Sequence, residues 1–142
     1  MEHIIFENDF YEVKISYKGE VEATKEFRFS DYAKFYDAGC NGWDKDPEVS
    51  RMFLHCQQNY ANEMLRRKGY LFLNDVYELL GIPRTRAGQV VGWIYSEYNV
   101  TGDNFVDFGI YNKYNADFVN GYVKTAVLDF NVDGNILDEL KD

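Results

Sequence analysis

The residue pattern closest to a known chemical motif is Asp129-x-Asn131-x-Asp133-Gly134, near the C-terminal end of the chain. Carboxylate and amide oxygens at this spacing match the first, third and fifth positions of a calcium-binding loop, and the glycine matches the sixth. The twelfth position of such a loop is a bidentate glutamate, whereas this chain has Leu140 there. The preceding segment also has the pattern of a strand, not of a helix. We therefore expect a β-turn, and cation binding by these three side chains is the alternative.

Histidine and cysteine, the usual zinc ligands and partners in nucleophilic catalysis, are scarce: the chain has only His3, His55, Cys40 and Cys56. His55 and Cys56 are adjacent, and neighbouring residues on a helix point about 100° apart, so they do not readily pair. The ligand spacings typical of zinc sites are missing, which argues against a metal centre. We expect Cys56 to be a core thiol and both thiols to be reduced.

Motifs that hold phosphate or perform acid–base chemistry are also missing. Neither GxxxxGK[ST] nor GxGxxG occurs, and Gly81, Gly88 and Gly92 are too widely spaced to hold a phosphate. Carboxylates are so abundant that no pair of them stands out as general acid and base. We expect a protein with no catalytic residues, no metal and no cofactor.

Basic residues form one cluster in the sequence, which consists of Arg66, Arg67, Lys68, Arg84 and Arg86. Such a cluster could bind an anion or an acidic partner. The interpretation that we prefer is a solvated surface in which the first three residues compensate the dipole of a helix end. One small basic patch on an acidic protein makes direct nucleic-acid binding improbable.

The strongest compositional signal is the abundance of acidic and aromatic residues. Asp and Glu number 24 against 15 Lys and Arg, which gives a net charge of −9, and there are 12 Tyr, 11 Phe and 2 Trp. Most of the rings should pack a sheet, and the charge by itself provides solubility. Tyrosine is also enriched at contact surfaces, and an acidic field favours basic partners. If the protein binds another protein, we expect the contact face to contain Tyr95, Tyr98, Asp103, Asp107, Tyr111 and Tyr114.

The length of 142 residues predicts a single domain, residues 1–142. The first ten residues lack the basic and apolar regions of a signal peptide, and no run reaches the roughly 18–20 apolar residues of a membrane span. We therefore expect a cytosolic protein that does not associate with membranes.

The longest predicted element is a helix over 47–68. Asp46 is a good N-cap, Pro47 suits the first helical position, and Gly69 suits the position after the last turn. An apolar stripe recurs at helical spacing and should face the core. Its members are Val49, Met52, Phe53, Cys56, Tyr60 and Met64.

Alternating apolar residues predict a β-hairpin over 10–29, with a turn at Lys18-Gly19. After the long helix, Asn74 should cap a short helix that ends before Gly81, and Thr85 should cap a further turn. Weaker expectations are helical turns at 32–36 and 115–120, strands at 91–97, 104–111 and 123–132, and a type I′ turn at Asp133-Gly134 with a return through Ile136. Together these predict an α+β fold: an N-terminal β-hairpin, a long amphipathic helix, short helices, and an antiparallel meander packed on the long helix.

Residues 69–137 resemble a family of small phage and prophage proteins of Gram-positive bacteria, whose function is unknown. The resemblance lies in Gly69-Tyr70-Leu71-Phe72-Leu73-Asn74-Asp75-Val76-Tyr77-Glu78-Leu79-Leu80-Gly81-Ile82-Pro83-Arg84-Thr85, in Gly92-Trp93, and in the later Asp107-Phe108-Gly109-Ile110 and Leu128-Asp129-Phe130. It implies a phage origin and a shared fold, and it transfers no active site. Many relatives carry an N-terminal membrane segment, which this chain does not match.

These observations favour a phage- or prophage-encoded acidic domain that binds a host or phage protein with a basic surface. One version is an inhibitor of a host defence or nucleic-acid-processing protein, acting in the bacterial cytoplasm. A second hypothesis is a structural or assembly component of the virion, which predicts self-association. A third is a small-molecule-binding protein with a pocket lined by Trp43, Trp93 and Arg84.

Overall fold

The computed structural model describes residues 3–7, 10–17, 20–98, 102–137 and 140, with the first three strands described by their backbone alone. The helices are α1 (Pro47–Lys68), α2 (Leu73–Leu80) and α3 (Ala116–Val119), with short 3-10 turns at Ala87–Gln89 and Lys113–Asn115. The strands are β1 (His3–Glu7), β2 (Phe10–Tyr17), β3 (Glu20–Arg28), β4 (Lys34–Tyr36), β5 (Tyr70–Phe72), β6 (Val91–Ile94), β7 (Ala126–Leu128) and β8 (Gly134–Asn135). The predicted α+β class is confirmed.

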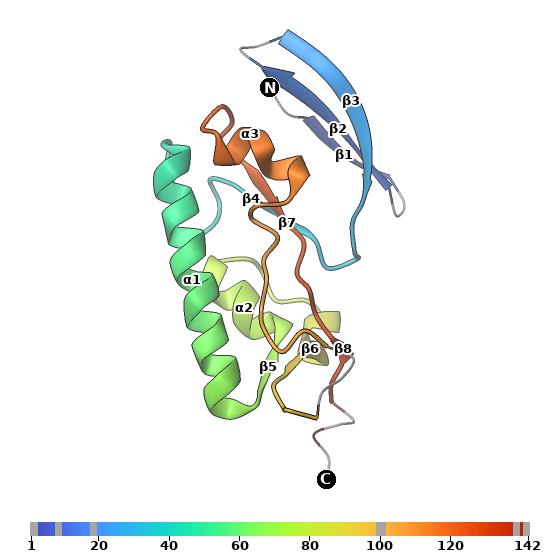
Figure 1. The fold of residues 1–142 in the computed structure, drawn as a ribbon, viewed down its shortest axis with the longest axis vertical. Helices are drawn as coiled ribbons and strands as arrows, with labels where there is room; N and C mark the ends of the chain where they lie inside the picture. Colours follow the sequence, from blue (N-terminus) through green and yellow to red (C-terminus); the bar gives the residue numbers. More distant parts are fainter. Residues whose placement is uncertain (1–2, 8–9, 18–19, 99–101, 138–139, 141–142) are drawn as a thin grey trace.

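An antiparallel sheet in the order β1-β2-β3 forms one end of the molecule, beside α3 (Figure 1). Strands β2 and β3 are the predicted hairpin, and the register shifts at Ile15/Ser16, where a β-bulge interrupts the pairing. The predicted turn at Lys18-Gly19 lies outside the described residues. The sequence did not predict β1, which is short and pairs with β2 from Glu7↔Phe10 to His3↔Lys14.

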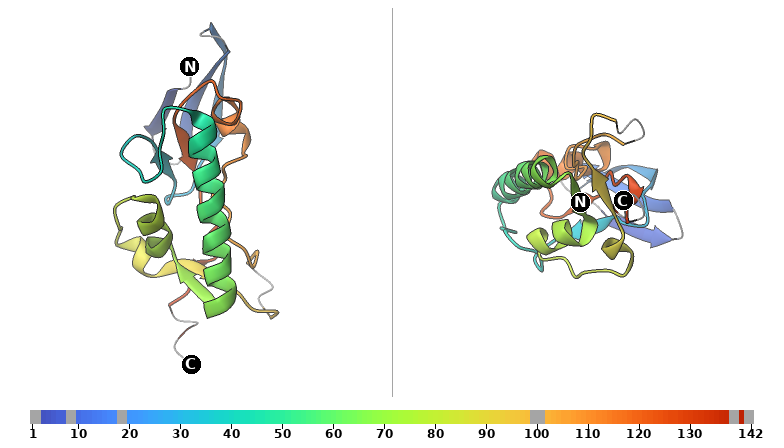
Figure 2. Two further views of the ribbon diagram at one scale, coloured as in Figure 1. Left: turned by 90° about the vertical axis from the view of Figure 1, so that its left-hand side faces the viewer. Right: turned by 90° about the horizontal axis from the view of Figure 1, so that it is seen from below.

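Helix α1 begins and ends at the predicted residues. The side chain of Asp46 accepts a hydrogen bond from the Glu48 N–H at 3.0 Å, and Pro47 occupies the first helical position. Gly69 adopts φ = 85°, and its N–H donates to the Leu65 carbonyl, which closes the last turn. The helix runs along the outer side of the molecule and spans most of its body (Figure 2).

The face of α1 that packs inward is not the predicted one. Its buried residues are Ser50, Leu54, Ala61, Met64 and Leu65, and of the predicted stripe only Met64 is buried. Met52 is 59% exposed and Val49 and Tyr60 are each 46% exposed, while Cys56 is exposed and Phe53 half-buried. At about 100° per residue the two sets centre on faces more than 90° apart. The expectation of a core thiol at Cys56 is therefore wrong. The packed face includes small residues such as Ser50 and Ala61. The sequence-based prediction followed one row of large apolar side chains and therefore overlooked this face.

The C-terminal half contributes strands to two further antiparallel sheets, in the orders β4-β7 and β5-β6-β8. The segment predicted as a helical turn at 32–36 contains β4, which pairs with β7 through Phe35↔Val127. The predicted terminal hairpin is also wrong, because β8 pairs with β6 through Gly92↔Gly134. Gly134 has φ = 120°, but Asp133 lacks the positive φ that a type I′ turn requires at both central positions.

One main core joins α1 to the small sheets. Its largest fully buried side chains include Trp93, Tyr36, Tyr77, Phe108 and Phe118. The ring of Phe130 packs edge-on against both Tyr77 and Phe108, at centroid distances of 5.5 Å. Such edge-to-face contacts add to the stabilisation that burial of the rings provides.

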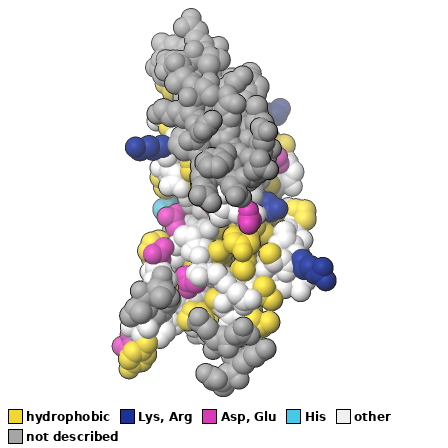
Figure 3. Space-filling model, turned by 90° about the vertical axis from the view of Figure 1, so that its right-hand side faces the viewer, with side chains coloured by type: hydrophobic (Ala, Val, Ile, Leu, Met, Phe, Trp, Pro, Cys, Tyr) yellow, Lys and Arg dark blue, Asp and Glu magenta, His cyan; other side chains and the backbone are white. Residues whose placement is uncertain are grey.

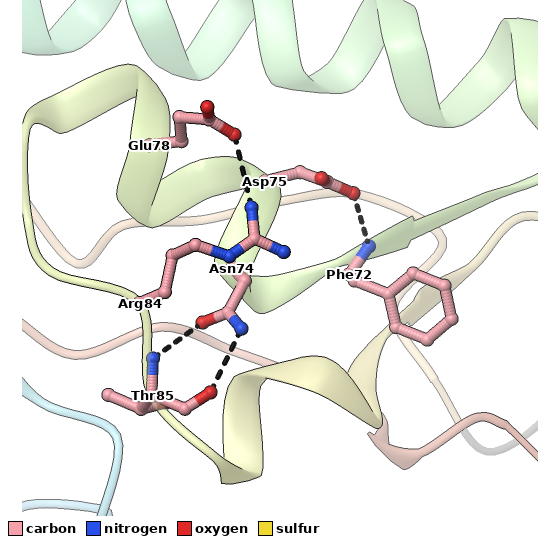
Figure 4. A network of polar contacts seen from close by, with 6 residues as sticks. All are labelled: Phe72, Asn74, Asp75, Glu78, Arg84 and Thr85. Atoms are coloured by element: carbon pink, nitrogen blue, oxygen red, sulfur yellow. Dashed lines mark hydrogen bonds and ion pairs between the residues drawn. The ribbon is translucent and has the colours of Figure 1, made fainter.

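Helix α2 is connected to the following loop by Asn74, which is fully buried (Figure 4). Its Oδ1 accepts from the Thr85 N–H and its Nδ2 donates to the Thr85 carbonyl, both at 2.9 Å. Asn74 is therefore not the predicted N-cap: α2 begins at Leu73, and Asp75 accepts from the Phe72 N–H instead. The Thr85 hydroxyl accepts from the Gly88 N–H at 3.0 Å, as expected for the cap of the next turn.

We expect Asn74→Ala to lower the free energy of unfolding by about 2 kcal/mol, because it removes a buried side chain and leaves the N–H and carbonyl of the half-buried Thr85 without these partners. Urea unfolding followed by circular dichroism measures this. Thr85→Ala, which removes only the hydroxyl bond to Gly88, should cost about 1 kcal/mol. Equal losses for both variants would contradict the role given to the Asn74 amide.

Candidate interaction surface

The segment 95–111, between β6 and the turn at Lys113–Asn115, contains five of the six residues predicted to contact a partner, and three asparagines outside it hold it in place. Asn131 has four hydrogen bonds. Its Oδ1 accepts from the Asp107 N–H at 2.7 Å and from the Trp93 indole N–H at 2.9 Å. Its Nδ2 donates to the Phe105 carbonyl at 2.9 Å and to the Asp103 carboxylate at 3.0 Å.

Two side chains of α1 hold the next part of the segment. Asn62 accepts from the Val106 N–H at 2.7 Å and donates to the Val106 carbonyl at 3.0 Å. Gln58 accepts from the Phe108 N–H at 2.8 Å. We use the term amide clamp for an asparagine whose Oδ1 accepts from a backbone N–H and whose Nδ2 donates to a backbone carbonyl. Asn62, Asn74, Asn115 and Asn131 are amide clamps, and Asn115 binds Val127 and Gly109.

The amide clamps explain why 104–111 is not the predicted strand. Val106, Phe108 and Ile110 are buried, as the alternation indicated. The backbone of the segment, however, bonds mainly to side chains. Its backbone bonds are those from the Asp129 and Asn131 N–H groups to the carbonyls of Phe108 and Asp107, and one local bond from the Asn112 N–H to the Gly109 carbonyl. Side-chain amides thus take the place of a regular neighbouring strand.

This segment exposes aromatic rings beside carboxylates. Of the seven exposed aromatic side chains in the described part of the chain, four lie here: Tyr95, Tyr98, Phe105 and Tyr111. Tyr98 is 83% exposed, and Glu97 and Asp103 are exposed beside it in sequence. Figure 3 shows the side opposite to α1, where hydrophobic patches and acidic side chains occupy the lower half. Sequence reasoning missed Phe105, because phenylalanine was assigned to the core.

Two of the predicted contact residues do not serve that role. Tyr114 is buried, its ring packs edge-on against Phe29 at 4.6 Å, and its hydroxyl accepts from the Asn112 side chain at 2.7 Å. Asp107 is half-buried, and its carboxylate accepts from the Gly109 N–H at 2.8 Å. Four of the six predicted residues are therefore exposed, namely Tyr95, Tyr98, Asp103 and Tyr111, and Phe105 is exposed beside them.

The Asp129-x-Asn131-x-Asp133 pattern does not gather oxygens around one point. Asp129 accepts from the N–H and hydroxyl of Ser30, and Asp133 accepts from the Ile94 N–H at 2.8 Å. Asn131 binds the segment described above. The three side chains thus join the C-terminal segment to three parts of the fold. In the described part of the chain no cluster of three His, Cys, Asp or Glu residues is suited to a metal ion.

The basic cluster is divided between two elements. Arg66, Arg67 and Lys68 form the last turn of α1, where successive side chains point about 100° apart and compensate the helix dipole. Arg84 contacts Glu78 of α2 at 3.3 Å (Figure 4), and Arg86 is exposed in the following loop. This arrangement fits a solvated surface better than a focused anion site.

The two tryptophans and Arg84 do not form the binding pocket considered above. Trp93 is fully buried with its indole N–H donated to Asn131, while Trp43 is half-buried and donates to the Lys124 carbonyl at 2.8 Å. Both indole groups are thus used within the fold.

Cys40 is half-buried, and burial raises the pKa of its thiol, which disfavours the reactive thiolate.

The fold and this surface define an acidic α+β domain in which side-chain amides hold irregular segments and aromatic rings between β6 and the turn at Lys113–Asn115 are exposed to solvent. The chain belongs to a family of unknown function, DUF6353, whose model matches residues 2–140. Neither a curated protein nor a solved structure matches it significantly. None of the helices in the described residues has the length and apolar character of a bilayer span.

We expect Asn131→Asp to lower the free energy of unfolding by about 2–3 kcal/mol at pH 7. The change removes both donated bonds and places a second carboxylate against Asp103. Protonation of either carboxylate restores a donor, so the loss relative to wild type should shrink towards pH 4. Urea unfolding at several pH values measures this. Combining it with Asp103→Asn returns a donor to the contact and should recover part of the loss; no recovery would contradict the assignment.

Burial raises the pKa of Tyr114 from 10.0 to about 12, so the folded protein resists ionisation of this ring. The raised pKa means that the neutral Tyr114 ring stabilises the folded state. This stabilisation is complete below pH 10 and is lost as the pH rises towards 12. We expect wild type to lose stability faster than Tyr114→Phe between these pH values, measured by urea unfolding. Tyr98→Phe, at an exposed ring, should follow wild type. Parallel curves for wild type and Tyr114→Phe would show that the ring does not contribute.

Proposed function

We propose that this protein is a phage- or prophage-encoded domain that binds another protein through segment 95–111. The observation that carries the proposal is the concentration of exposed rings on this segment, although it has no regular secondary structure. Tyrosine and phenylalanine provide large contact areas with few rotatable bonds, which suits them to interfaces.

The way in which the segment is held supports the same function. Its backbone is fixed at residues 105–108 by Asn131, Asn62 and Gln58. The Asn104 side chain accepts from the Ser96 N–H at 3.2 Å, which joins the two ends of the loop. Backbone that is fixed before binding, as at residues 105–108, loses less conformational entropy on association.

The charge of the chain indicates the kind of partner. The net charge of −9, with Glu97 and Asp103 exposed among the rings, favours a protein with a basic surface. A nucleic-acid-processing or defence protein of the bacterial host has such a surface, so we propose that the domain inhibits one in the host cytoplasm. The phage origin rests on the sequence resemblance over residues 69–137.

Affinity capture tests this function. Tagged wild-type protein should retain a basic protein from a nuclease-treated lysate of the bacterial host in a salt-sensitive manner. Tyr98→Ala and Glu97→Lys should each weaken retention about tenfold, the scale of an interface hot spot. Asp103 and Asp107 are unsuitable for charge reversal, because both carboxylates accept internal hydrogen bonds.

The matched control is Tyr60→Ser, which alters an exposed tyrosine on α1, away from the segment. Retention that is equal for wild type, Tyr98→Ala and Glu97→Lys would refute the proposed surface. Recovery of only virion proteins would instead favour a component of the phage particle.

A further inference from the structure

We draw no further inference here: the strongest candidate, the exposed apolar side chains of Val49, Met52 and Tyr60 on the outer face of α1, carries none, because exposed charges of both signs at Glu63 and Arg67 lie on the same face and nothing in the structure shows what covers it.

Discussion

The structure depends on side-chain amides that replace peptide groups as hydrogen-bonding partners. Asn62, Asn74 and Asn131 each bind both an N–H and a carbonyl of irregular backbone, and Asn115 binds both groups of Val127 in β7. A buried peptide group without a partner is strongly destabilising, so the loops could not lie against the core without these amides. The short strands of the body, most of three residues or fewer, are sufficient only because the amide clamps order the chain between them.

The side-chain hydrogen bonds to the loops link the core of the protein to its surface. Helix α1 contributes Leu54 and Leu65 to the core and Gln58 and Asn62 to hydrogen bonds with the loop, while Val49, Met52 and Tyr60 are exposed to solvent. One helix thus presents three chemically different faces. Segment 95–111 in turn has a buried edge at Val106, Phe108 and Ile110 and an outer edge of aromatic rings. The same stretch of backbone therefore places one set of side chains in the core and another set in contact with solvent.

Local signals in the sequence were sufficient to predict the helix ends that neighbouring capping residues determine. The N-cap at Asp46, the exit at Gly69 and the αL residue at Gly81 lie where capping chemistry predicts. Long-range contacts could not be predicted. Neither the pairing of β4 with β7 nor the contact between Asn131 and Trp93 produces a pattern in the sequence around these residues. Apolar periodicity failed on α1, because apolar residues recur at helical spacing on two faces and the predicted face is mostly exposed. Of the rings predicted for a contact face, Tyr95 and Tyr98 after β6 are exposed, whereas Tyr114 is buried with its ring against Phe29.

The amide clamps also determine how the protein should age chemically. Asparagine deamidates when the following backbone nitrogen attacks its side chain, and a following glycine offers the least steric hindrance. Bulkier residues follow Asn62, Asn74, Asn115 and Asn131, namely Glu, Asp, Ala and Val. The two Asn-Gly pairs, Asn41-Gly42 and Asn120-Gly121, lie in exposed loops outside the clamps. Spontaneous deamidation is thereby directed to Asn41 and Asn120 and away from the amide clamps.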